Sequence, residues 1–95
     1  MLTFEWNRTK ARANALKHGV TFEEARSVFY DDQARQFFDE GHSDSEDRFI
    51  MLGLSDRFRL LVVCHAGDAS GETIRIISAR KATKTEQAFY LSYVR

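Results

Sequence analysis

Three consecutive apolar segments constrain the fold of this chain more than any other feature. They are RFIMLGLS (residues 48–55), RLLVVCHA (59–66) and TIRIISA (73–79). Each has the length and apolar character of a β-strand, and the connections around Asp56 and over GDASGE (67–72) are short. Strands joined by such short turns pair as an antiparallel meander. The second half of the chain therefore predicts a sheet built on three successive neighbours.

The first twenty residues predict a short strand followed by a helix. MLTFEW (1–6) alternates apolar with polar residues, as a half-buried strand does. Asn7 is a suitable N-cap for a helix over RTKARANALKH (8–18), because its side chain can accept a hydrogen bond from a free amide of the first turn. Gly19 is suited to end this helix, since the residue after a helix often takes a left-handed conformation.

Two capping-box patterns predict where the other helices begin. In TFEE (21–24) and TKTE (83–86), the threonine hydroxyl can accept from the glutamate amide while the glutamate side chain accepts from the threonine amide. A helix over about residues 22–30 would follow the first pattern, and the last helix would follow the second. ARQFFD (34–39) predicts another short strand, and EGHSDSED (40–47), which has no apolar residue, predicts an exposed loop.

The predicted order of elements is β-α-α-β-β-β-β-α. Helices gathered at the two ends of the chain, beside a run of strands, indicate an α+β fold with the helices packed on one face of a central antiparallel sheet. The other face would then be open to solvent or to a partner. With 95 residues, the chain predicts one domain over residues 1–95.

Several classes of protein are disfavoured by the sequence. The longest apolar run, LLVVC (60–64), is too short to span a membrane, and no signal-peptide pattern begins the chain, so a cytoplasmic protein is expected. The three histidines have no metal-ligand spacing, so neither a metal nor another cofactor is expected. Cys64 lies inside the apolar run and is interpreted as a small buried hydrophobe rather than a catalytic thiol.

The neutral net charge conceals an uneven distribution. Residues 1–20 carry four bases and one acid, residues 21–56 carry three bases and ten acids, and residues 73–95 carry five bases and one acid. If the fold brings the two basic ends together, they would form a face suited to nucleic acid. The alternative interpretation is that these charged side chains merely solvate the surface, which would give the same charge distribution.

The joint between the third apolar segment and the last helix is the strongest candidate for phosphate binding. Arg80 and Lys81 end the strand just before a helix N-terminus, so a phosphate there would meet two cations and the positive end of the helix dipole. Lys84 lies in the first turn of that helix. A salt bridge from Arg80 to a carboxylate of the acidic middle segment is an equally good interpretation.

Strand alternation indicates where a further cation would point. Along TIRIISA, alternation places Arg75, Ile77 and Ala79 on one face and the residues between them on the other. Because one of the two sets must face the helices, Arg75 is expected to project to the open face with the other members of its set.

Cleavage of RNA without a metal ion needs a base for the 2′-hydroxyl, cations for the charge that develops at phosphorus, and an acid for the leaving 5′-oxygen. His18 ends the first helix, where the dipole favours its protonated form, although it could instead face the core. Lys17 beside it could equally be a solvated lysine, and Arg48 could simply neutralise the acids of the preceding loop. The side chains of Glu86 and Tyr90 could point toward Arg80 at the end of the strand. Alternatively, they could belong to the face of the last helix that packs in the core.

Taken in order, several stretches resemble the BrnT family of bacterial type II toxins. They are FEW followed by Asn7, KHGVTFEEA, DRF with LG, and RIISARKAT with Glu86 and Tyr90 downstream. The resemblance covers almost the whole chain. It departs from the family at Asn7, where aspartate is more common, and in lacking the proline that often follows the FYDD stretch.

This resemblance implies a RelE-like fold and a small, metal-independent endoribonuclease that inhibits translation and growth. It implies a BrnA-type antitoxin with a ribbon-helix-helix domain, and contact with operator DNA only through the toxin–antitoxin complex. Among the residues, it favours Lys17, His18, Arg48 and Arg80 as catalytic, supported by Glu86 and Tyr90. A binding module that cuts nothing, and that serves its antitoxin as a co-repressor, is the competing hypothesis.

Overall fold

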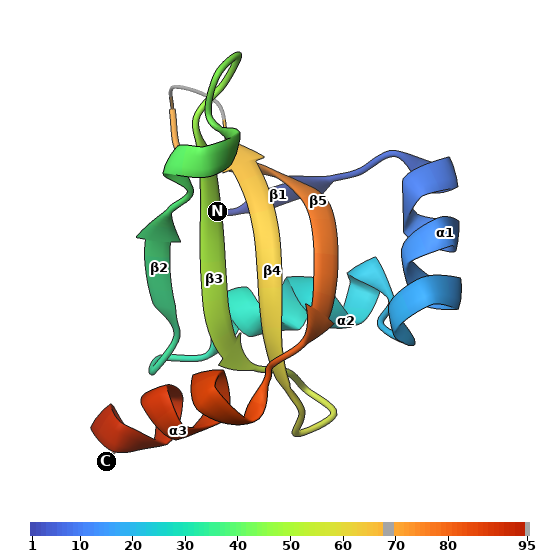
Figure 1. Ribbon diagram of the computed structural model, residues 1–95. Coiled ribbons are helices and arrows are strands. Elements are labelled where there is room, and N and C mark those ends of the chain that lie inside the picture. Colours follow the sequence, from blue (N-terminus) through green and yellow to red (C-terminus); the bar gives the residue numbers. More distant parts are fainter. Residues whose placement is uncertain (68–69, 95) are drawn as a thin grey trace.

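The structure is a computed structural model that describes residues 1–67 and 70–94 (Figure 1). Within these residues, five strands form one sheet in the order β1-β5-β4-β3-β2. The strands are β1 (Thr3–Glu5), β2 (Arg35–Phe38), β3 (Arg48–Leu54), β4 (Leu60–Gly67) and β5 (Thr73–Lys81). The helices are α1 (Arg8–His18), α2 (Phe22–Ser27) and α3 (Lys84–Tyr93), with short 3-10 turns at Val28–Tyr30 and Glu40–His42.

The α+β class is confirmed, and so is the antiparallel meander. Neighbouring strands from β2 to β5 pair antiparallel, and β1 adds a parallel edge by pairing with β5, where Phe4 lies opposite Ile74. The sheet is therefore mixed rather than wholly antiparallel. The predicted connection over residues 67–72 includes residues 68 and 69, which lie outside the described part of the chain.

The helices do not all lie on one face, which differs from the expectation. Leu61 and Val63 of β4 are fully buried in a cluster with Phe22 of α2, whereas Val62 between them belongs to a second cluster with Tyr90 of α3. Because successive side chains of a strand point to opposite faces, the two clusters lie on opposite sides of the sheet. The helix α2 covers one face, and α3 covers one end of the other (Figure 1). The helix α1 lies beside the β5 edge, where the Asn14 side chain forms hydrogen bonds with the Ala79 backbone.

Local capping chemistry places most helix ends where the sequence predicts them. The Asn7 side chain accepts from the Lys10 amide at 2.9 Å, and Gly19 ends α1 with a φ of 67°. At α3 the capping box is complete, with both reciprocal hydrogen bonds present between Thr83 and Glu86. These residues fix where the chain enters and leaves the helices that border the site.

The capping box predicted at the start of α2 is only half formed. Thr21 accepts from the Glu24 amide, but the Glu24 carboxylate accepts from Arg59 and from the Ser55 hydroxyl instead of returning to Thr21. Glu24 is 4% exposed, and the hydrogen bonds from Arg59 lower its pKa. A buried carboxylate requires a cation, and this need outweighs a local cap.

A bulge in β5 alters the predicted face of its second half. Cys64 of β4 lies opposite Ser78, but the next residue of β4 lies opposite Ile76, so β5 carries one extra residue at this point. Ala79 is consequently buried on the same face as Ile76, and the prediction that Ala79 shares a face with Arg75 is wrong. A bulge reverses the side-chain alternation beyond it. Arg75 and Arg80, five positions apart, therefore both point to the face opposite α2.

Candidate active site

A pocket of about 280 Å³ lies on the sheet face opposite α2 and reaches the C-terminal end of α1. Its charged and polar lining comes from five separate parts of the chain and consists of His18, Asp39, His42, Arg48, Cys64, Ser78 and Arg80. We call this hollow the cationic pocket. Three of the residues singled out in the sequence, His18, Arg48 and Arg80, thus share one pocket.

Each of these three side chains is positioned at the end of an element. His18 is the last residue of α1, Arg48 is the first residue of β3, and Arg80 is the penultimate residue of β5. Arg80 lies opposite Val62 in the β4–β5 register. It is therefore on the face of the sheet where Val62 packs with Tyr90 of α3. The bulge is what allows Arg80 to face this pocket.

Arg80 is held by Glu86 in a two-pronged ion pair. Its Nη1 and Nη2 atoms donate to the two carboxylate oxygens at 2.8 and 2.9 Å, and Nη1 also approaches the Lys81 carbonyl at 3.3 Å. The hydrogen bond from Arg80 lowers the pKa of Glu86 to about 2. Glu86 is therefore a carboxylate at neutral pH and a poor general base, and its two oxygens hold the Arg80 guanidinium in one orientation. No described residue accepts from the Nε–H of Arg80, which remains available to an anion.

Arg48 brings a loosely paired cation to the pocket. Its Nε atom is buried and has no hydrogen-bond partner among the described residues, since the nearest Glu46 oxygen is 3.7 Å away. Glu46 is engaged by Arg75, whose Nη2 donates to it and lowers the pKa of this carboxyl. Arg48 thus forms only a loose ion pair with Glu46, and its side chain is 30% exposed, so an anion entering the pocket would meet the exposed part of Arg48 rather than the shielded Nε–H.

His42 joins the site although the sequence placed it only in an exposed loop. Its Nδ1 lies 3.1 Å and 3.2 Å from the two carboxylate oxygens of Asp39. Because an ionised carboxylate only accepts hydrogen bonds, Nδ1 carries the proton and Nε2 of a neutral ring is left with its lone pair. The i, i+3 spacing of Asp39 and His42 was the one signal in the sequence that could have indicated this pair.

The remaining predicted residues lie around the pocket or away from it. Lys17 is exposed on the last turn of α1, and Lys81 and Lys84 are exposed at the joint between β5 and α3. None of these three lysines is among the residues that line the cationic pocket. They could contact a long phosphate chain without touching the reacting atoms.

The Tyr90 side chain does not point toward Arg80. It is 4% exposed, and its hydroxyl donates to Asp31 Oδ2 at 2.6 Å. Burial, followed by this hydrogen bond, raises the pKa of Tyr90. Tyr90 therefore packs α3 against the sheet, as the core-stripe interpretation expects.

Cys64 lies in the wall of the cationic pocket rather than in the core. It is only half-buried and faces the side opposite the fully buried Val63. Burial raises the pKa of the Cys64 thiol, and the nearby charge of Asp39 adds to this effect. The thiol is therefore protonated at neutral pH, which argues against a nucleophilic role.

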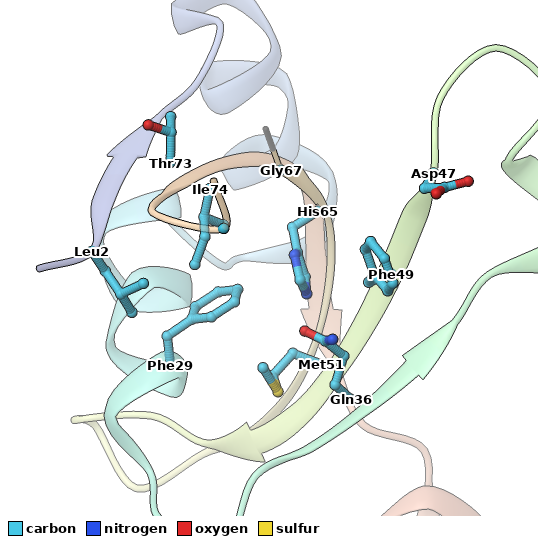
Figure 2. Close-up of a pocket in the computed structure, with 11 residues that line it drawn as sticks. Leu2, Phe29, Gln36, Asp47, Phe49, Met51, His65, Gly67, Thr73 and Ile74 are labelled. Atoms are coloured by element: carbon cyan, nitrogen blue, oxygen red, sulfur yellow. The ribbon is translucent and has the colours of Figure 1, made fainter. Parts of the chain in front are cut away.

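A larger hollow of about 660 Å³ is lined mainly by apolar side chains, including those of Leu2, Phe29 and Met51 (Figure 2). His65 lies between the rings of Phe29 and Phe49, at centroid distances of 4.8 and 5.9 Å, and is 4% exposed. Burial lowers the pKa of His65 to about 4, so the ring is neutral at pH 7. This hollow therefore lacks the positive charge that phosphate requires.

No group of three or more histidine, cysteine, aspartate or glutamate side chains is arranged to hold a metal ion in residues 1–67 and 70–94. In the same residues, no helix has the length and apolar character needed to cross a membrane.

Comparison with known proteins identifies a family and a related fold. The family model described as "Ribonuclease toxin, BrnT, of type II toxin-antitoxin system" matches residues 6–86. The crystal structure of the Brucella abortus ribonuclease toxin BrnT, at 1.1 Å resolution, matches with a TM-score of 0.66 and 21% sequence identity. The match covers 88% of this chain and 100% of that one, and at this identity it shows a shared fold. No curated protein sequence matches the chain.

Proposed function

Because the chain belongs to the BrnT family of type II toxin–antitoxin ribonuclease toxins, we propose that it is an endoribonuclease whose active site is the cationic pocket. The observation that carries this proposal is the gathering of His18, Arg48, Arg80 and the Asp39–His42 pair in one pocket. These are the groups that cleavage by the neighbouring 2′-hydroxyl requires.

The proposed reaction is internal transesterification without a metal ion. A base removes the proton of the 2′-hydroxyl, and the 2′-oxygen forms a bond to phosphorus. The bond from phosphorus to the 5′-oxygen breaks, and an acid protonates that oxygen. The products are a 2′,3′-cyclic phosphate and a 5′-hydroxyl, so atoms and charges balance.

Arg48 and Arg80 would bind the phosphate and stabilise the negative charge that grows on its oxygens. Arg48 offers its partly exposed side chain, which pairs only loosely with Glu46, and Arg80 offers the donor that Glu86 does not use. A guanidinium held by a carboxylate is fixed in orientation before the substrate arrives, which lowers the cost of reorganisation in the transition state. Arg75, Lys81, Lys84 and Lys17 would contact flanking phosphates.

Two imidazoles are available for the two proton transfers. We assign the base to His42, because Asp39 holds the Nδ1 proton and leaves Nε2 free to accept. His18, at the C-terminal end of α1, is the second imidazole that lines the pocket and would be the acid.

The same proposal includes the biological context. The chain would act in the cytoplasm, inhibit translation by cutting RNA, and be neutralised by a BrnA-type ribbon-helix-helix antitoxin through which it contacts operator DNA. The RelE-like assignment of the fold belongs to this proposal as well. Family membership supports an antitoxin partner and an RNA substrate.

The test is cleavage of single-stranded RNA by the purified protein in the presence of EDTA. Arg48→Ala or Arg80→Ala should lower the rate at saturating RNA about 100- to 1,000-fold, and His18→Ala or His42→Ala about 100- to 10,000-fold. Lys17→Ala, outside the pocket, should weaken RNA binding most at low salt, where a lysine–phosphate contact contributes most, without changing that rate. Intact RNA with folded wild-type protein would overturn the proposal and favour the co-repressor hypothesis.

A further inference from the structure

A second hollow adjoins the cationic pocket on the same face of the sheet. It has a volume of about 370 Å³, and its lining includes Phe37, Ile50, Val62, Glu86 and Phe89. We call it the aromatic pocket. Ile50 and Val62 line both pockets, so the two hollows share a floor on β3 and β4.

Two rings form the open walls of this pocket. Phe37 is 42% exposed and Phe89 is 48% exposed, and their ring centroids are 5.8 Å apart at an interplanar angle of 53°. Phe37 comes from β2 and Phe89 from α3, so each ring reaches the pocket from a different element. Large apolar side chains that stay half-exposed beside charged residues are typical of a binding surface rather than of a core.

Glu86 connects the two pockets. Its carboxylate holds Arg80 in the cationic pocket, while its side chain lines the aromatic pocket. In RNA, each phosphate within the strand links two riboses, and each ribose carries a base. A strand whose phosphate contacts Arg80 must therefore place a neighbouring base close to this shared wall.

We propose that the aromatic pocket binds the base of a nucleotide next to the cleaved phosphate, by stacking on Phe89 with Phe37 at the rim. This inference rests on the proposed ribonuclease function and adds a substrate subsite to it. A cationic groove combined with exposed aromatic rings is the arrangement that binds single-stranded nucleic acid, whose unpaired bases expose their flat faces. This combination favours RNA over a protein segment as the occupant.

The chemistry of the pocket also limits its selectivity. Both carboxylate oxygens of Glu86 are occupied, by Arg80 and by the Thr83 amide, so Glu86 does not read the edge of a base. The base would be recognised only by stacking on the rings of Phe37 and Phe89. The subsite should therefore accept every base, with modest preferences that follow stacking strength.

The test combines a variant with a modified substrate. The probe is a ten-nucleotide 2′-fluoro RNA, which lacks the attacking hydroxyl. It is compared with a series of versions of the same RNA, each of which has an abasic sugar in place of one nucleotide. Affinity for wild-type protein should fall about 5- to 150-fold when the stacked base is removed. Phe89→Ala should lower the affinity for the complete probe by a similar factor. Removing the stacked base from the probe should then cause no further loss of affinity in this variant. Phe89→Trp should retain binding.

Leu91→Ala is the matched control, because Leu91 lies on the same helix, is 64% exposed and is not part of the pocket lining. Its affinity and abasic profile should equal those of wild type. If base removal costs the same in Phe89→Ala as in wild type, the base subsite is refuted even when ordinary RNA is cleaved. If ordinary RNA stays intact with the wild type, the ribonuclease proposal fails independently of this result.

Discussion

The buried histidine beneath the apolar hollow predicts a strong pH dependence of stability. Burial lowers the pKa of His65 in the folded protein from 6.5 to about 4. In the unfolded chain this ring takes up a proton below pH 6.5, whereas in the folded protein it stays neutral down to about pH 4. Acid therefore favours the unfolded state, and the folded state loses stability as the pH falls through this interval.

The size of the effect follows from the same values. Each unit of pKa corresponds to about 1.4 kcal/mol, so the interval from 6.5 to about 4 amounts to about 3 kcal/mol of unfolding free energy. Such a loss is large beside a total stability of about 5–15 kcal/mol. Above pH 6.5 both states carry a neutral ring, and His65 makes no contribution to the pH dependence.

The assay is urea unfolding of the wild type and of His65→Leu at several pH values between 4 and 7. The wild type should lose about 3 kcal/mol more than the variant across this range. His42→Ala is the control, because the His42 side chain is 71% exposed and its removal should preserve the wild-type slope. Identical pH profiles for wild type and His65→Leu would refute the reasoning, as would an NMR titration that finds His65 protonating near pH 6.5 in the folded protein.

Three substitutions test contacts that stabilise the fold. Gly53→Ala would place a methyl group 2.8 Å from a side-chain carbon of the buried Val28, and overpacking of this kind should lower the unfolding free energy in urea by about 1–3 kcal/mol; an unchanged midpoint would contradict the packing. Arg59→Ala leaves the buried Glu24 carboxylate without its cation and should cost about 3–5 kcal/mol in thermal unfolding. Adding Glu24→Gln should recover part of this loss, and no recovery would argue against the pair. Thr83→Ala removes an N-cap and should cost about 1 kcal/mol, with faster amide exchange in α3.

Helix ends and strand positions were largely predictable because they depend on neighbours in the sequence. The bounds predicted for α1 agree with Arg8–His18, and the capping residues Asn7 and Thr83 make the hydrogen bonds expected of them. The prediction at Glu24 was wrong because its carboxylate reaches Arg59, 35 residues further along the chain. A capping pattern of four residues carries no information about so distant a partner.

The candidate site was predictable in part. His18, Arg48 and Arg80 were singled out, and they line one pocket, although their catalytic roles remain predictions. His42 was missed because its partner Asp39 and its approach to the pocket depend on how the loop between β2 and β3 folds back. The aromatic pocket was missed because Phe37 and Phe89 lie on elements far apart in the sequence.

The amino-acid sequence by itself determined the number and type of elements, their caps and the chemical character of the residues at their ends. These properties arise from hydrogen bonds and side-chain periodicity within a few residues. Only the tertiary structure decided which residues share a face. The bulge at Ile77 reverses the alternation of β5, so Arg80 joins Arg48 and Arg75 on one side of the sheet. A bulge forms through pairing with β4, and that pairing depends on contacts between distant segments, which no local pattern specifies.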